Sequence, residues 1–155
     1  MFKRLLVPLD GSELSESALP AALYLARTLD AQVTFLHVIE HNPPEAVHGQ
    51  RHITTVDEGA GYLAATLESI GGDENFAQHV HPNRENDVAR SIVDHAEELG
   101  IDLIVMCTHG RSSLRRLLFG SIAQRVISLG ETPVLLIHPS ETIFGHSFTC
   151  RRILA

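Results

Sequence analysis

The sequence has few of the residues that mark a secreted or membrane-embedded protein. Its 155 residues include two cysteines, Cys107 and Cys150, and no tryptophan. Two distant cysteines do not form the disulfide framework of a small secreted domain, and no apolar run approaches the roughly 20 residues of a membrane-spanning helix. The opening segment reaches Pro8 and Asp10 too soon for the apolar region of a secretory signal. We therefore expect a cytoplasmic chain with reduced thiols and no membrane partner.

Positive charge is also scarce. Lysines and arginines number 12 against 19 aspartates and glutamates, which gives a net charge of −7. A nucleic-acid-binding protein normally presents excess positive charge, so we expect no nucleic-acid partner, although a local basic patch could still bind a small anion. Hydrophobic residues make up 44% and charged residues 20% of the chain. This balance and this length are typical of one globular domain, which we place at residues 1–140.

Apolar runs alternate with helical patterns along the chain. Pro20 should kink the first helix near its first turn because it cannot donate to the carbonyl of Glu16. Residues 41–54 form a polar loop. The predicted strands are 3–10, 31–40, 75–81, 102–107 and 132–139, and the predicted helices are 13–29, 56–70, 87–99 and 121–130.

This alternation predicts an α/β fold, a doubly wound five-stranded parallel sheet with helices on both faces. If the chain first moves outward from the first strand and later returns beside it, the strand order is 3-2-1-4-5. Ligands in such sheets bind outside the carboxyl ends of the strands at the switch point. That point lies where the first strand ends, at Pro8–Asp10, and where the fourth ends, at Met106–Gly110.

A Gly/Ser-rich basic stretch, "THGRSSLRRLLFGSIAQRV", follows the fourth strand. Gly110 and Gly120 would let the backbone approach a ligand closely, and a helix beginning near Ser121 would point free N–H groups at an anion. Arginines between the glycines, Arg111, Arg115 and Arg116, could add charge. The alternative is a long connection whose glycines only solve turn geometry. Neither a Walker A loop nor a Gly-x-Gly-x-x-Gly fingerprint occurs.

Other polar residues have competing interpretations. Asp10 could accept hydrogen bonds from a ribose or an adenine amino group, or it could cap the first helix, a role open to Ser12 or Ser15 as well. His41, His48 and His52 share one polar loop without the spacing of a zinc site, so we predict a solvated loop and no metal. His109, beside Gly110, is expected to face solvent. No catalytic triad, paired carboxylates or nucleophile elbow is present, and the fold alone proves no chemistry.

The stretches "RLLVPLDGSELSESAL", "DLIVMCTHGRSSLRRLLFGSIAQRVI" and "TPVLLIHP" resemble the universal stress protein family over about residues 2–139. One branch of that family binds ATP through Gly-x2-Gly-x9-Gly-Ser/Thr, and Gly110, Gly120 and Ser121 match its last three elements. Cys107 replaces the first glycine, which places a sulfur near the path of the nucleotide. The resemblance further implies Asp10 for the ribose or base, a backbone N–H of Ile122 for phosphate, and Mg²⁺ or Mn²⁺ bound through the phosphates. It also implies an adenine wall made of Pro8, Val38 and Met106.

The resemblance implies a stress-response module that acts through conformation or partners with little turnover. A nucleotide-free dimeric module and an ATP-using phosphotransferase or adenylating enzyme remain alternatives. Family members often form homodimers through the last strand, here 132–139. The tail at 141–155 ends in "FTCRRILA", which resembles the start of the chain. It is either the beginning of a second tandem repeat, which would then pair with that strand, or a chance basic tail.

Overall fold

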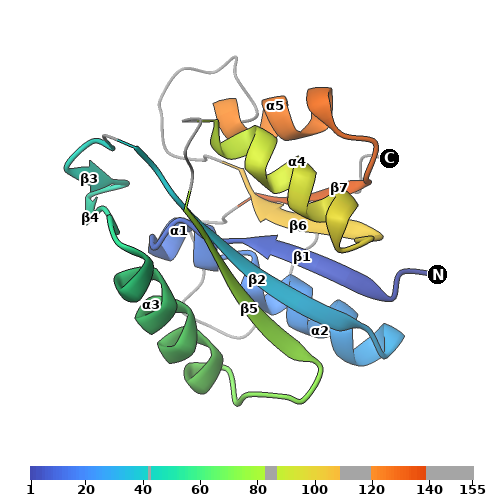
Figure 1. Ribbon diagram of the computed structural model, residues 1–155. Helices are drawn as coiled ribbons and strands as arrows, with labels where there is room; N and C mark the ends of the chain where they lie inside the picture. The colour runs from blue at the N-terminus through green and yellow to red at the C-terminus, as the bar shows by residue number, and fades with distance from the viewer. Residues whose placement is uncertain (42, 83–86, 109–119, 139–155) are drawn as a thin grey trace.

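The computed structural model describes residues 1–41, 43–82, 87–108 and 120–138 (Figure 1). Five strands form the main sheet: β1 (Arg4–Pro8), β2 (Gln32–Ile39), β5 (Phe76–Pro82), β6 (Leu103–Cys107) and β7 (Val134–Ile137). Their order is β5-β2-β1-β6-β7, and all four pairings are parallel. In chain order these strands are 3-2-1-4-5, so the predicted fold class is confirmed.

Helices cover both faces of the sheet (Figure 1). Side chains alternate between the faces of a strand, so Leu5 and Val7 pack in one core and Leu6 packs in the other. The first core is covered by α2 (Leu19–Leu29) and α3 (Val56–Ser69), and the second by α4 (Val88–Glu98) and α5 (Ser121–Leu129). Among the described helices, none is both long and apolar enough to span a membrane.

The first predicted helix differs from the structure. Residues 13–29 form two helices, α1 (Glu13–Glu16) and α2, instead of one kinked helix. Pro20 lies in the first turn of α2, where a missing N–H group leaves no hydrogen bond unmade. The proline therefore helps to begin a new helix and does not bend an existing one.

The polar loop after β2 contains a hairpin that the sequence did not predict. Strands β3 (Ala46–Val47) and β4 (Gln50–Arg51) pair antiparallel. His48 and Gly49 form the turn with φ values of 49° and 84°. Positive φ at both central residues is the geometry of a type I′ turn, which matches the twist of the flanking strands. The hairpin places the His48 side chain over the carboxyl ends of the sheet.

Candidate functional site

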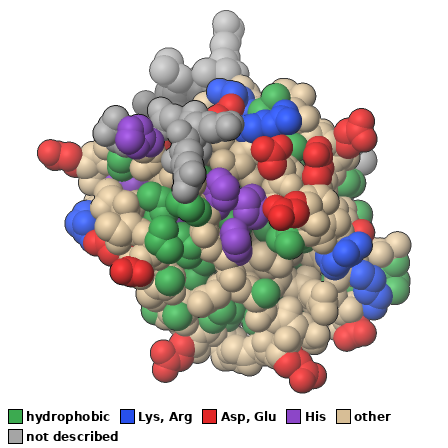
Figure 2. Space-filling model, viewed as in Figure 1, with side chains coloured by type: hydrophobic (Ala, Val, Ile, Leu, Met, Phe, Trp, Pro, Cys, Tyr) green, Lys and Arg blue, Asp and Glu red, His purple; other side chains and the backbone are tan. Residues whose placement is uncertain are grey.

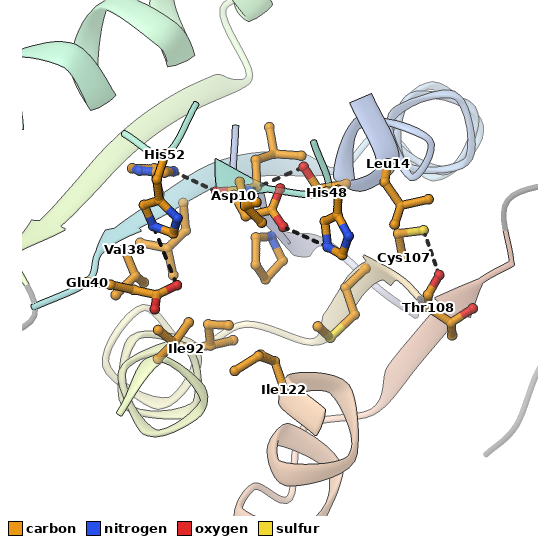
Figure 3. Close-up of a pocket in the computed structure, with 18 residues that line it drawn as sticks. Asp10, Leu14, Val38, Glu40, His48, His52, Ile92, Cys107, Thr108 and Ile122 are labelled. Atoms are coloured by element: carbon orange, nitrogen blue, oxygen red, sulfur yellow. Dashed lines mark hydrogen bonds and ion pairs between the residues drawn. The ribbon is translucent and has the colours of Figure 1, made fainter. Parts of the chain in front are cut away.

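A cavity of about 280 Å³ lies at the carboxyl ends of β1, β2 and β6, which is the switch point of the sheet (Figure 3). Its walls come from α1, α4, α5 and the β3–β4 hairpin. The lining residues are Pro8, Leu9, Asp10, Leu14, Ser15, Leu36, His37, Val38, Glu40, Val47, His48, His52, Val88, Ile92, Met106, Cys107, Thr108 and Ile122.

Aliphatic side chains form much of the wall. Val38 comes from β2, Met106 from β6, Ile92 from α4 and Ile122 from the first turn of α5. Val38 and Met106 are each less than a tenth exposed and belong to the core between the sheet and α4. An apolar wall with a few polar groups is the usual construction of a small-molecule site.

Asp10 supplies a carboxylate just beyond β1. Its Oδ1 atom accepts hydrogen bonds from the backbone N–H of Ser12 at 2.9 Å and from the Ser12 hydroxyl at 2.5 Å. Its Oδ2 atom lies 3.7 Å from Nε2 of His48. Asp10 is not the cap of α1, because Ser12 fills that role and accepts from the N–H of Ser15 at 3.2 Å. Ser12 thus fixes one carboxylate oxygen and leaves the other directed toward the hairpin.

Two buried histidines, His37 and His52, also line the cavity. His52 is only 4% exposed, and its Nε2 atom lies 3.7 Å from Oε1 of Glu40. His37 is 1% exposed, and its Nδ1–H donates to the carbonyl of Leu9 at 2.8 Å. Burial lowers the pKa of His37. Within the described residues, Nε2 of His37 and Nδ1 of His52 are buried without a hydrogen-bond partner.

These positions correct the prediction of a solvated histidine loop. His41 and His48 are exposed as expected, although His48 also lines the cavity, whereas His52 lines the cavity and is buried. His37 was missed because it lies inside an apolar strand pattern, where nothing in the sequence separates it from a core residue. The only local signal for the hairpin was the His48-Gly49 pair, since Gly readily adopts positive φ.

Cys107 lies at the end of β6 on the side of α1. Its Sγ atom accepts a hydrogen bond from the Ser17 hydroxyl at 3.0 Å and contacts the carbonyl of Thr108 at 3.2 Å. Burial raises the pKa of this thiol, so the thiolate that reacts with electrophiles is disfavoured. The strand order β2-β1-β6 separates Cys107 from Val38 across the cavity. The sulfur therefore narrows one side of the site and is anchored to the helix beside it.

The structure brings most of the predicted site residues to this cavity, namely Pro8, Asp10, Val38, Met106, Cys107 and Ile122. Gly120 is the buried N-cap of α5 and Ser121 is the exposed first residue of that helix, and neither lines the cavity. Gly120 has a φ of −62°, so its backbone conformation does not itself require glycine. His109, Gly110, Arg111, Arg115 and Arg116 lie outside the described residues, as does the tail at 141–155.

Comparisons with known sequences agree with one another. A family model described as the universal stress protein family matches residues 1–138. Universal stress protein YxiE of Bacillus subtilis is 31% identical over 150 residues, covering 88% of this chain and 99% of the relative. Universal stress protein MJ0531 of Methanocaldococcus jannaschii is also 31% identical, over 88% of this chain and 82% of the relative.

Solved structures share the fold. A universal stress protein in complex with cAMP has a TM-score of 0.63 at 20% identity and covers 90% of this chain and 98% of its own. The universal stress protein of Archaeoglobus fulgidus in complex with dAMP has a TM-score of 0.60 at 20% identity and covers 88% and 97%. The match to the family model over nearly the whole domain, joined to these likenesses, shows that the chain belongs to the universal stress protein family.

Proposed function

We propose that the cavity at the switch point binds an adenine nucleotide, with ATP as the ligand. The observation that carries the proposal is the combination of an aliphatic slot with a fixed carboxylate at the place where doubly wound sheets bind ligands. Two members of the same fold, described above, are in complex with cAMP and dAMP. The cavity volume, about 280 Å³, lies near the lower end for small-molecule pockets and suits the nucleoside part.

In this arrangement the base lies against Val38 and Met106, with Pro8 at its edge. The second oxygen of Asp10, Oδ2, lies 3.7 Å from Nε2 of His48 and also accepts hydrogen bonds from ribose hydroxyls, because the Ser12 contacts already hold the carboxylate in one orientation. Such an orientation lowers the entropic cost of binding.

The phosphates extend toward the beginning of α5. Ile122 places this helix at the cavity wall, and Gly120 offers no side chain that could cap the first N–H groups. Free N–H groups and the positive end of the helix dipole favour an anion there. Ser121 adds a hydroxyl donor. Any Mg²⁺ or Mn²⁺ would be held through the phosphates.

Calorimetric titration with ATP, cAMP and AMP tests the proposal, using Asp10→Ala and Gly120→Val. Both changes should abolish or strongly weaken binding, the first by removing the ribose acceptor and the second by filling the space near the phosphates. Gly72→Val is the matched control, because Gly72 does not line the cavity and its Cβ would meet only the carbonyl oxygen of Leu67, at an ordinary contact distance of 3.9 Å. Far-ultraviolet circular dichroism checks that each variant is folded. Unchanged ATP affinity in folded Gly120→Val protein would contradict the phosphate placement.

Nucleotide binding changes the conformation of the protein, which acts as a cytoplasmic stress-response module and hydrolyses or transfers little of the bound nucleotide. The competing enzyme function is tested by adding ATP and following the release of ADP or AMP. The competing nucleotide-free function is tested by analysing nucleotide in freshly purified protein. Bound nucleotide without release of products supports the module.

Assembly is proposed to use β7, which lies at an edge of the sheet. An apolar edge strand with free backbone groups is usually covered or paired. Antiparallel pairing of two copies around a two-fold axis would satisfy those groups, and in a tandem protein the second repeat would take the same place. Leu136→Pro removes a backbone donor from the strand and should convert a dimer to a monomer in light scattering. A wild-type chain that is monomeric at micromolar concentration would contradict the proposed dimer.

A further inference from the structure

Three histidines gather away from the cavity, on the face that α4 covers. His79 and His81 occupy alternate positions of β5 and so share one face of the strand, while His95 comes from the last part of α4. The His95 ring centroid lies 4.7 Å from that of His79 and 4.6 Å from that of His81. One ring nitrogen from each residue lies within 4.8 Å of the other two. Figure 2 shows histidine side chains clustered on this surface.

The position of His95 is fixed by the helix that carries it. His95 is 7% exposed, and its Nδ1 atom lies 2.9 Å from the carbonyl oxygen of Ser91. A carbonyl can only accept, so Nδ1 carries the proton and, in the neutral ring, Nε2 keeps its lone pair. A backbone carbonyl on the second ring nitrogen is the usual partner of a metal-bound histidine, because it sets both the tautomer and the ring orientation.

We propose that His79, His81 and His95 form a binding site for a divalent transition metal such as Zn²⁺. Zn–N bonds of about 2.0–2.1 Å in a tetrahedron require nitrogen atoms about 3.3–3.4 Å apart. His79 is exposed and His81 half-buried, so small side-chain rotations on β5 close the remaining separation while His95 stays in place. Three imidazoles leave a fourth position for water, and no thiolate takes part.

The surrounding charges favour a cation. Burial, and then the neighbouring His95 ring, lower the pKa of both His79 and His81; the carboxylates of Asp94 and Glu98 oppose this shift at His81, and Glu98 opposes it at His79. Asp94 is also paired with Arg90 at 2.9 Å, which leaves Glu98 as the less neutralised of the two. A bound ion would cross-link the edge strand β5 to α4.

The test is a zinc titration of the tag-free full chain in competition with a chromogenic chelator. One Zn²⁺ per chain should bind. His79→Ala, His81→Ala and His95→Gln should each weaken binding by more than the roughly 10- to 100-fold loss typical of an outer-shell partner. His41→Ala is the matched control, because His41 is an exposed histidine outside the cluster, and its affinity should not change. Urea midpoints without metal establish that the variants are folded.

Cobalt supplies a second readout. Co²⁺ bound by three imidazoles and water should give visible absorption bands without the intense near-ultraviolet bands of a cobalt–thiolate bond. Zinc should raise the melting temperature of the wild type and of His41→Ala but not of His79→Ala. The proposal would be overturned if the wild type failed to bind Zn²⁺ at micromolar concentration or if the cobalt complex had a thiolate spectrum. Wild-type zinc affinity in the three cluster variants would overturn it as well.

Discussion

Two glycines in α3 allow the packing between that helix and the sheet to be measured directly. Gly59 is buried and faces β2 and β5, whereas Gly61 is exposed two residues later in the same helix. Alanine at either position gains helix propensity of up to about 1 kcal/mol. The two positions differ in what the new methyl group meets.

At Gly61 a Cβ atom would have no neighbour within 4 Å. We therefore expect Gly61→Ala to stabilise the protein by about 0.5–1 kcal/mol, since only the propensity changes. At Gly59 the Cβ would lie 3.0 Å from Cγ1 of Val80 and 3.1 Å from Cδ2 of His37. Val80 is half-buried on an edge strand and can shift, but the His37 ring is buried and held by its bond to Leu9.

Overpacking of this kind costs about 1–3 kcal/mol. Gly59→Ala should therefore have a free energy of unfolding between that of the wild type and about 2 kcal/mol below it. The difference between the two variants, about 1–3 kcal/mol, isolates the steric cost because the propensity gain cancels. Equilibrium urea unfolding measures both. If Gly59→Ala were as stable as Gly61→Ala, the helix would be packed less closely on His37 than described and the reasoning would be refuted.

Three further predictions follow from local contacts. Cys107→Gly should tighten ATP binding by on the order of 1 kcal/mol, because it clears sulfur from the cavity but adds backbone freedom; calorimetry that finds weaker binding would show that the thiol packs favourably against the nucleotide. Thr55→Ala should lower the free energy of unfolding by about 1 kcal/mol, because the Thr55 hydroxyl caps α3 by accepting from the N–H of Glu58; an unchanged urea midpoint would argue against the cap. The Arg51 guanidinium, followed by the N–H of Thr54, lowers the pKa of Glu58 from its ordinary value of 4.5 to about 2. The stabilisation is therefore present above about pH 4.5 and lost as pH falls toward 2; Arg51→Gln should raise this pKa in a carboxyl NMR titration, and no change would exclude the pair.

The sheet could be predicted because its information is local. β2 and β6 are short apolar runs that end at polar or turn residues, and the alternation of such runs with helical patterns restricts the strand order to few choices. The same rule placed Asp10 and Met106 at one edge, and both line the cavity. Pro20 misled the prediction because a proline in a helical pattern is compatible with either a kink or a new helix, and neighbouring packing decides.

The rest of the site depends on contacts between distant segments. His52 is buried beside Glu40, whereas the polar composition of residues 41–54 had predicted a solvated loop. The grouping of His79, His81 and His95 depends on how α4 packs beside β5, which no spacing within one element encodes. Contacts between side chains of different elements could not be predicted from the sequence, because the periodic pattern of one helix or strand does not say which element packs beside it.

The β3–β4 hairpin has a consequence for how fast a ligand enters and leaves. It does not belong to the main sheet, and a two-stranded hairpin alone has little stability in water. It is held to the body of the protein by polar contacts, including the pair of His48 with Asp10 at 3.7 Å and the bond from the Glu13 N–H to Oε1 of Gln50 at 2.7 Å. Its backbone amides should therefore exchange with deuterium long before those of β1 and β2, through openings far smaller than global unfolding. Ligand entry and release would then follow the rate of these openings, and this rate would respond to salt, which screens the hairpin contacts.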